Sequence, residues 1–270
     1  NAARHLSATY AWEDARTANA RMKVSLAGDT ISAYGFAFDS LMGDLSYLKP
    51  SGTVALRVRQ GSARDYSLRG DFTLDQMRSE LRLADVSLRF DSTTWQTTHP
   101  SAVRWGGQGV EVVNLELRSG PTRRIYANGV LPSAGVANFD LSVTNFAVEN
   151  VAELLQSDVP LTGRVSLDAH VQGTGTAPQL RGTLDLAGAR YNGTTVPDVH
   201  GTFDYANERL TTNATAVDSS GHTLAKVDGT LPVNLALSGV TGSRLLDRPV
   251  DVSIASDSLP LDLLPQFTGV

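Results

Sequence analysis

Apolar and polar residues alternate over most of this chain, and turn residues interrupt the alternation about every ten to fifteen positions. The alternation is clearest between residues 162 and 232, where one parity of each run is apolar, as in Val165, Leu167 and Ala169. Alternation with period two is typical of strands that bury one face. The turns between successive runs are too short for crossover helices, so we expect an all-β fold whose sheet is mainly antiparallel.

The predicted strands cover residues 6–12, 21–26, 31–38, 54–58, 66–74, 80–90, 109–118, 123–131, 136–143, 165–171, 180–191, 199–205, 210–217, 223–237 and 250–254. Gly28 and Asp29 are predicted to form the turn between the second and third strands. Turn residues also separate later strands, at Asn192-Gly193, at Asn207-Glu208 and at Ser219-Ser220-Gly221.

Three short leucine-rich stretches predict helical turns between the strands. The first is residues 40–48, where Leu41, Leu45 and Leu48 have helical spacing and Pro50-Ser51-Gly52 follows. The other two contain Val148, Val151, Leu154 and Leu155, and Leu261, Leu263 and Leu264. Each stretch precedes a Ser or Thr followed by Gly, so we expect these turns to mark the boundaries of structural units.

Two stretches of the chain match one another in the same order. Ser51-Gly52-Thr53-Val54-Ala55-Leu56 matches Thr162-Gly163-Arg164-Val165-Ser166-Leu167, and Gly52 lies 111 positions before Gly163. The later matches are Leu68-Arg69-Gly70 with Leu180-Arg181-Gly182 at an offset of 112, Asn128-Gly129-Val130-Leu131-Pro132 with Asp228-Gly229-Thr230-Leu231-Pro232 at 100, and Phe139-Asp140-Leu141-Ser142-Val143 with Val250-Asp251-Val252-Ser253-Ile254 at 111. Such self-similarity predicts an array of repeats that share one core.

These matches define the predicted organisation of the chain. Residues 50–160 are repeat unit one and residues 161–267 are repeat unit two, each about 110 residues long. Residues 1–49 are the end of a preceding unit, and residues 268–270 begin a further unit. We therefore expect the chain to be an internal piece of a longer protein.

Composition narrows the classes of partner. With 270 residues, of which 41% are hydrophobic, the chain can bury a substantial core. Its net charge of −5 and the absence of a basic stripe with interleaved aromatic residues argue against a nucleic-acid partner. The sequence has no cysteine, which excludes disulfides and thiolate metal sites. It contains no run of 18 apolar residues, so we expect no transmembrane segment within this chain.

The sequence shows no pattern of residues that points to catalysis. His5, His99, His170, His200 and His222 lie far apart and lack metal-ligand spacing, so surface or turn positions are the better interpretation. It contains no nucleophile elbow, phosphate-binding loop or zinc-protease motif. We therefore expect neither an enzyme nor a bound metal or cofactor. The positions of Trp12, Trp95 and Trp105, in a core or at the rim of a groove, stay open at this point.

One family shares an ordered set of features with residues 50 to 267. The set comprises Trp95, Gly109-Val110-Glu111-Val112, Val113-Asn114-Leu115-Glu116-Leu117, Ser119-Gly120, Arg124-Ile125-Tyr126-Ala127-Asn128-Gly129, Phe139-Asp140-Leu141 and Gly163-Arg164-Val165-Ser166-Leu167. With Pro178-Gln179-Leu180-Arg181-Gly182-Thr183-Leu184 and Gly201-Thr202-Phe203-Asp204-Tyr205, it resembles the TamB family, the inner-membrane component of the translocation and assembly module. That family belongs to the AsmA-like group of bridge-like lipid transfer proteins.

The resemblance implies an elongated, taco-like β-groove that crosses the periplasm of a Gram-negative bacterium as part of a protein anchored in the inner membrane. It implies that phospholipid acyl chains move along the groove and support outer-membrane biogenesis. It also implies an outer-membrane partner of the TamA type, related to the BAM complex, reached through regions outside this segment. The residues expected to line the groove are Val54, Leu56, Leu68, Phe72, Leu81, Leu83, Leu115, Leu117, Leu141, Val143, Val165, Leu167, Leu184, Leu186, Phe203, Val227 and Leu231.

Two other functions fit the same strand pattern. Exposed strand edges would suit an assembly chaperone that binds outer-membrane or autotransporter proteins by β-augmentation. Alternating Leu and Val are also typical of closed sandwich cores, which would make the chain a structural β-sandwich array of a surface protein. The sequence leaves the choice between an open groove and a closed core undecided.

Overall fold

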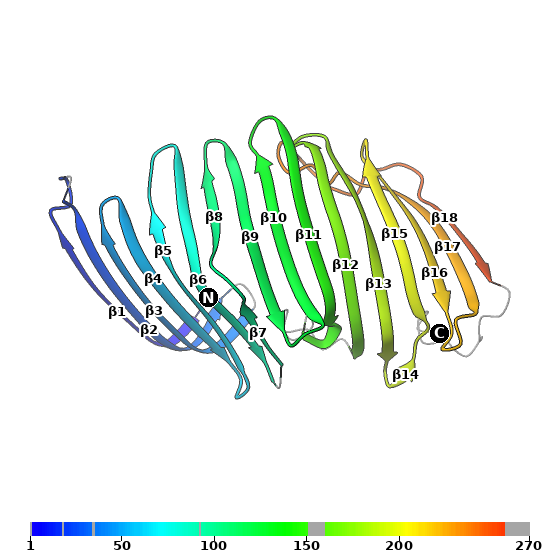
Figure 1. The fold of residues 1–270 in the computed structure, drawn as a ribbon, viewed down its shortest axis with the longest axis horizontal. Coiled ribbons are helices and arrows are strands. Elements are labelled where there is room, and N and C mark those ends of the chain that lie inside the picture. The colour runs from blue at the N-terminus through cyan, green and yellow to red at the C-terminus, as the bar shows by residue number, and fades with distance from the viewer. Residues whose placement is uncertain (1, 18, 34–35, 92, 151–159, 257–270) are drawn as a thin grey trace. The chain divides into compact units, whose positions relative to one another are not determined.

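The computed structural model describes residues 2–17, 19–33, 36–91, 93–150 and 160–256, and these are almost entirely β-structure (Figure 1). The strands are β1 (Ala2–Glu13), β2 (Arg21–Ala33), β3 (Phe36–Leu48), β4 (Ser51–Gln60), β5 (Arg64–Thr73), β6 (Arg78–Phe90), β7 (Thr93–Thr97), β8 (Ser101–Gly106), β9 (Gly109–Ser119), β10 (Arg123–Pro132), β11 (Val136–Ala147), β12 (Leu161–Thr174), β13 (Pro178–Tyr191), β14 (Thr194–Thr195), β15 (Asp198–Ala206), β16 (Arg209–Val217), β17 (Thr223–Pro232) and β18 (Asp251–Ser256). The prediction of an all-β fold is confirmed.

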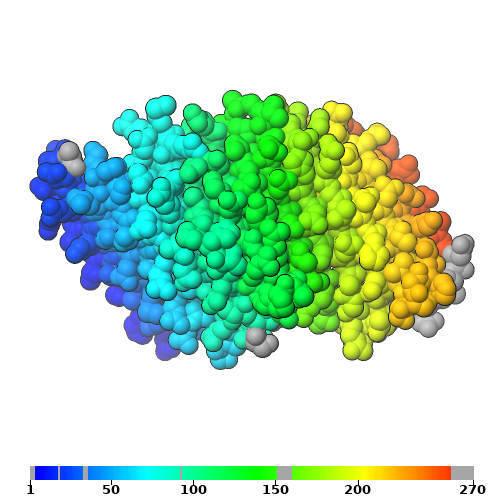
Figure 2. Space-filling view, viewed as in Figure 1, coloured from blue at the N-terminus to red at the C-terminus, as the bar shows by residue number. Residues whose placement is uncertain are grey.

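The chain forms two compact units, Asn1–Val130 and Leu131–Val270, which we call unit 1 and unit 2. In unit 1, strands β1 to β6 pair in chain order, and β7 and β8 together lie between β6 and β9. In unit 2, strands β11 to β18 pair in chain order except for the two-residue β14, which pairs with the end of β13. All of these pairings are antiparallel, as predicted. Figure 2 shows the residues of unit 2 as bands in chain order, as expected for consecutive strands that lie side by side.

The strand inventory accounts for the changing offset between the matched stretches. Between β5 and β10 the chain forms β6, the pair β7 and β8, and β9, whereas between β13 and β17 the only long strands are β15 and β16. The second stretch therefore contains one strand position fewer in the sheet, counting β7 and β8 as one. This makes it shorter, in line with the fall in offset from 112 to 100. The offset returns to 111 because a long connection precedes β18. The compact units divide the chain differently from the repeat units, whose boundaries remain a prediction.

The predicted helical turn at residues 40–48 is wrong, because this segment belongs to strand β3. Leu41 and Leu45 also share strand parity with Gly43 and Tyr47, and all four residues are half-buried. Leu45 and Val54 are register partners, so the backbone N–H and C=O groups of this segment form hydrogen bonds with strand β4. Residues 148–150 begin a helix, as predicted, while residues 151–159 and the stretch with Leu261, Leu263 and Leu264 lie outside the described residues.

The predicted turn at Gly28 and Asp29 is also wrong, because β2 continues through both residues to Ala33. The glycine serves close packing instead, since a Cβ atom there would lie 2.9 Å from Cδ1 of Ile31 and 3.1 Å from Cδ1 of Leu6. The strand predicted at residues 31–38 is wrong as well, because residues 31–33 end β2 and residues 36–38 begin β3. The strand predicted at residues 223–237 ends at Pro232, and strands β7 and β8 were not predicted.

The predicted hairpin turns are confirmed. Asn192 and Gly193 have φ angles of 50° and 78°, and Asn207 and Glu208 have 52° and 59°. Positive φ at both central residues is the geometry of a type I′ turn, whose twist matches the flanking strands. At the third turn, the Asp218 carboxylate accepts hydrogen bonds from the backbone and hydroxyl of Ser220 and from the backbone of His222, and these bonds lower its pKa to about 2.

Candidate functional site

The register of unit 2 places apolar side chains on one sheet face, which we call the apolar face. Partners in neighbouring strands point to the same side of a sheet, so rows of partners can be followed across the unit. One row runs through Val143, Leu167, Leu184, Gly201, Ala214, Val227 and Ile254. A second row, nearer the strand ends, runs through Val171, Leu180, Tyr205, Leu210 and Leu231.

The opposite face of unit 2 is polar along the same strands. The row that includes Asp185 runs through Ser166, Asp185, His200, Thr215 and Lys226. Another runs through Asp140, His170, Arg181, Asp204, Thr211 and Thr230. Each apolar residue therefore has its chain neighbours on the other side of the sheet. The segregation follows from strict alternation in the sequence, which strand pairing converts into two chemically different surfaces.

The apolar face of unit 2 is partly open to solvent, with most residues of the two rows half-buried. Leu184, near the middle of the row, is 43% exposed, and Ile254 in β18 is 67% exposed. Burial is greatest at the strand ends, where Tyr205 is 2% exposed. Contiguous exposed apolar area is typical of surfaces that bind an apolar partner.

Unit 1 has the same division into faces. Its apolar face includes the register partners Leu56, Leu68 and Val86, and also Phe72, Leu81 and Val103. Aromatic rings pack against one another on this face, with 6.0 Å between the centroids of Tyr47 and Phe72 and 5.4 Å between those of Tyr66 and Phe90. Trp95 is 0% exposed, whereas Trp12 and Trp105 keep exposed surface. The tryptophans thus divide between core and surface.

The structure places every residue expected to line the groove on the apolar face of its own unit. In unit 1 these are Val54, Leu56, Leu68, Phe72, Leu81, Leu83, Leu115 and Leu117. In unit 2 they are Leu141, Val143, Val165, Leu167, Leu184, Leu186, Phe203, Val227 and Leu231. Phe72, Leu83 and Leu117 are buried, so they pack against their neighbours and offer no surface to a ligand. Leu56 and Leu184 are the most open of the set.

An aromatic ring packs directly over a glycine on the apolar face of unit 2. Gly182 pairs with Phe203, and a Cβ atom at Gly182 would lie 2.5 Å from Cζ of that ring and 2.0 Å from the Asp168 carbonyl oxygen. The ring therefore lies across the glycine backbone. Unit 1 repeats the arrangement, because a Cβ atom at Gly52 would lie 2.4 Å from Cζ of its partner Phe72. Only glycine fits beneath each ring.

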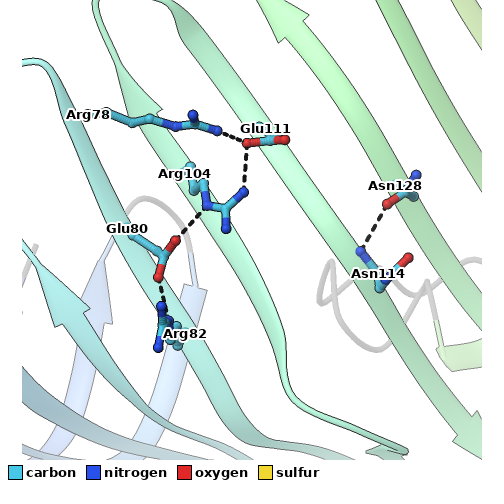
Figure 3. Close-up of polar contacts among 7 residues, drawn as sticks. All are labelled: Arg78, Glu80, Arg82, Arg104, Glu111, Asn114 and Asn128. Atoms are coloured by element: carbon cyan, nitrogen blue, oxygen red, sulfur yellow. Dashed lines mark hydrogen bonds and ion pairs between the residues drawn. The ribbon is translucent and has the colours of Figure 1, made fainter.

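Charged residues on the polar face of unit 1 form a continuous network (Figure 3). Arg104 donates to Glu80 at 2.5 Å and to Glu111 at 3.1 Å, while Arg82 and Arg78 pair with the same two carboxylates. The Arg104 guanidinium holds the pKa of the Glu80 carboxyl below its ordinary value of 4.5, with a smaller contribution from Arg82. The network satisfies the charges that one strand face presents to its neighbours.

We expect Arg104→Met to reduce stability at neutral pH by up to about 1 kcal/mol. A carboxyl whose pKa is lowered by folding stabilises the fold above its unfolded pKa, and this contribution is lost as the pH falls through the folded pKa. The difference between the parent and Arg104→Met should therefore be present at pH 7 and shrink below pH 4.5. Urea unfolding at both pH values measures it.

Arg69→Met is the matched control for this prediction. Arg69 forms an ion pair with Asp85 at 3.3 Å, and its side chain is 71% exposed. We expect almost no change in the urea midpoint at either pH. Equal losses for the two substitutions would contradict the assignment of stability to the Arg104 network.

Residues 233–246 form a segment that crosses one end of the apolar face of unit 2; we call it the strap (Figure 1, the faded orange loop behind the sheet). The Tyr205 side chain lies on this face, and its hydroxyl oxygen accepts a hydrogen bond of 2.8 Å from the Leu235 N–H. The N–H groups of Leu237 and Ser238 donate to the carbonyl oxygen of Gly175, in the turn between β12 and β13. Sequence reasoning extended a strand into this segment, although Pro232 and the later glycines were available as signals against it.

The remaining polar groups form no assembled reactive site in the part of the chain that the structure describes. His170 and His200 lie on the polar face and pair with Asp140 at 2.6 Å and Asp185 at 2.7 Å. Residues 2–17, 19–33, 36–91, 93–150 and 160–256 contain no cluster of three or more potential metal ligands. An open depression in unit 1 follows the polar face, with Lys23, Asp71 and Arg82 in its lining. No helix among the described residues is long and apolar enough to cross a bilayer.

Comparisons of the chain with protein families, with curated proteins and with solved structures yield no match. The chemistry of the two sheet faces is therefore the main indication of function.

Proposed function

We propose that this chain is a periplasmic segment of a TamB-like protein, anchored in the inner membrane, whose apolar sheet faces line a groove for phospholipid acyl chains. The observation that carries the proposal is the separation of the two apolar rows from the polar rows across β11 to β17, with Leu184 still 43% exposed. An acyl chain needs a continuous apolar surface and no specific polar contact. Weak contacts repeated along the rows would let it slide.

The dimensions of the strands fit this role. Four apolar positions follow one another along β13, from Leu180 through Gly182 and Leu184 to Leu186. At about 3.3 Å per residue, this span is roughly 20 Å, comparable to an extended acyl chain. Glycine and alanine at several positions of the neighbouring strands leave room between the larger side chains. The polar face can remain in water while the apolar face contacts lipid.

The exposed side chains favour this function over a closed sandwich. A sandwich requires a second sheet packed about 10 Å above the apolar face. In unit 2 the described strands form one layer, and Ile254, at the last strand, is 67% exposed. The open face therefore supports a ligand-binding surface more than a structural array.

Equilibrium binding of a fluorescent phospholipid to the full chain tests the proposal. We expect saturable binding that unlabelled phospholipid displaces and that a soluble glycerophosphate headgroup without acyl chains leaves unchanged. The headgroup is expected to have no effect because the proposed contacts are between the apolar face and the acyl chains. Displacement by the headgroup alone, or no saturable binding by folded protein, would exclude acyl-chain recognition.

A further inference from the structure

The strap has no counterpart in the matched stretch upstream. Leu131-Pro132 continues into strand β11 after Ser133-Ala134-Gly135, whereas Leu231-Pro232 continues into residues 233–246 before the match resumes. The offset between the stretches rises from 100 to 111 across this connection, so the strap adds eleven residues. The sheet is complete on either side of it, which indicates that the strap has a role other than joining strands.

Hydrogen bonds hold the strap across the apolar face. Besides the bonds to Tyr205 and Gly175, the Val233 N–H donates to the Glu208 carbonyl oxygen. The Arg244 guanidinium donates to the carbonyl oxygens of Asn234 and Ala236, which closes the strap on itself. These bonds place the strap over the row that contains Tyr205, Leu210 and Leu231.

Only one apolar residue of the strap is fully buried. Ala236 is 5% exposed, Val233, Leu235, Val240 and Leu246 are half-buried, and Leu237 and Leu245 are 50% and 57% exposed. Its backbone makes a single isolated bridge, between Val233 and Leu245, and Gly239 and Gly242 have φ angles of 75° and 89°. A segment with few fully buried apolar side chains can open locally at a lower free energy than global unfolding requires.

We propose that the strap is a movable cover that controls access of acyl chains to the Tyr205 row, with the Tyr205 hydroxyl as its latch. This inference rests on the proposed function, because the strap would determine where along β13 to β17 an acyl chain binds. With the strap closed, acyl chains reach the row of Leu184 and stop short of Leu231. Displacement of the strap extends the apolar surface to the strand ends.

A disulfide can lock the strap reversibly. A Cβ atom at Gly175 would lie 3.9 Å from Cβ of Ser238, within the range of about 3.5–4.5 Å that disulfides require. The chain has no cysteine of its own, so Gly175→Cys with Ser238→Cys gives one defined bond. A strap-free variant replaces residues 233–246 with Ser-Ala-Gly, the chain's own short connection. Tyr205→Phe removes only the latch, with the ring kept in place.

The experiment measures photo-crosslinking of a phospholipid to the full chain, with a photoreactive residue at Leu231 or at Leu184. We expect crosslinking at Leu231 to rise at least fivefold on reduction of the locked variant, and to be high in the strap-free variant and raised in Tyr205→Phe. Crosslinking at Leu184 should be the same in all variants, because the strap does not cover that row.

Three results would overturn the inference. Equal crosslinking at Leu231 in the locked and strap-free variants would show that the strap does not cover the row. If crosslinking at Leu231 in the reduced variant stays as low as in the locked variant, and is also low in Tyr205→Phe, the strap does not move. Loss of crosslinking at Leu184 in every folded variant would remove the proposed function and this inference with it, whereas normal labelling at Leu184 confines a failure to the strap.

Discussion

Leu184→Glu is expected to weaken phospholipid binding at least tenfold, equivalent to about 1.4 kcal/mol. Leu184 lies in the middle of the apolar row and is 43% exposed, so a carboxylate there would face any acyl chain bound on the row. A carboxylate loses hydration when hydrocarbon covers it, and no cation lies opposite, since the register partners are Leu167 and Gly201. Leu186→Glu should act in the same direction.

Thr202→Glu is the matched control for Leu184→Glu. Thr202 is exposed on the polar face of the adjacent strand, and its register partners are Thr183 and Asn213. The added charge is the same, but it faces water, so we expect phospholipid affinity within a factor of two of the parent. Similar losses for the two substitutions would mean that net charge, and not the apolar face, governs binding.

Gly182→Ala is expected to destabilise unit 2 by about 1–3 kcal/mol, the cost of overpacking a filled site. The new methyl group would lie 2.0 Å from the Asp168 carbonyl oxygen and 2.5 Å from Cζ of Phe203. The carbonyl belongs to the neighbouring strand, so relief requires movement of backbone as well as of the ring. Chemical unfolding followed by circular dichroism measures the loss.

Gly201→Ala provides the control for that prediction. Gly201 lies on the same apolar face, and a Cβ atom there would meet its nearest neighbours at 3.5 and 3.6 Å, which is ordinary contact. Alanine in a strand is favoured over glycine by roughly 0.5–1 kcal/mol, so we expect unchanged or slightly raised stability. A loss at Gly201 as large as that at Gly182 would show that the close approach at Phe203 is not the cause.

The sequence predicts the two faces well because alternation and pairing are local properties. Val165, Leu167, Leu184 and Leu186 share parity within their strands, and the positive-φ turn at Asn192-Gly193 sets the end of the hairpin that follows β13. Once one face of each strand is apolar, antiparallel pairing aligns those faces without further information. The residues of the apolar face could therefore be named before the structure, whereas their contact with a ligand stays a prediction.

Spacing alone misleads where a strand contains leucines that also fit a helix. Leu41 and Leu45 are four residues apart, which suits a helical turn as well as one face of a strand. An apolar residue at position 43 would have indicated the strand, but this position is glycine. The pairing of β3 with β2 and β4 settles the choice. Local propensity is overridden here by tertiary pairing.

Non-local contacts account for the features that sequence reasoning missed. The strap is fixed by bonds from Leu235 to Tyr205 and from Leu237 to Gly175, which lie 30 and 62 residues apart in the chain. Strands β7 and β8 are short and share the tier between β6 and β9, so neither gives a long alternating run. The exposure of Leu184 likewise depends on whether residues distant in the sequence pack against the apolar face.

The most direct test of the apolar-face account compares photo-crosslinking of phospholipid at Leu184 and at Asp185 in chains isolated from a Gram-negative periplasm. The two residues are adjacent in β13 and point to opposite faces, so they share every condition except the face. We predict phospholipid adducts by mass spectrometry at Leu184 and none at Asp185. Equal labelling at both positions, or none at Leu184 in folded protein, would contradict a lipid-binding apolar face.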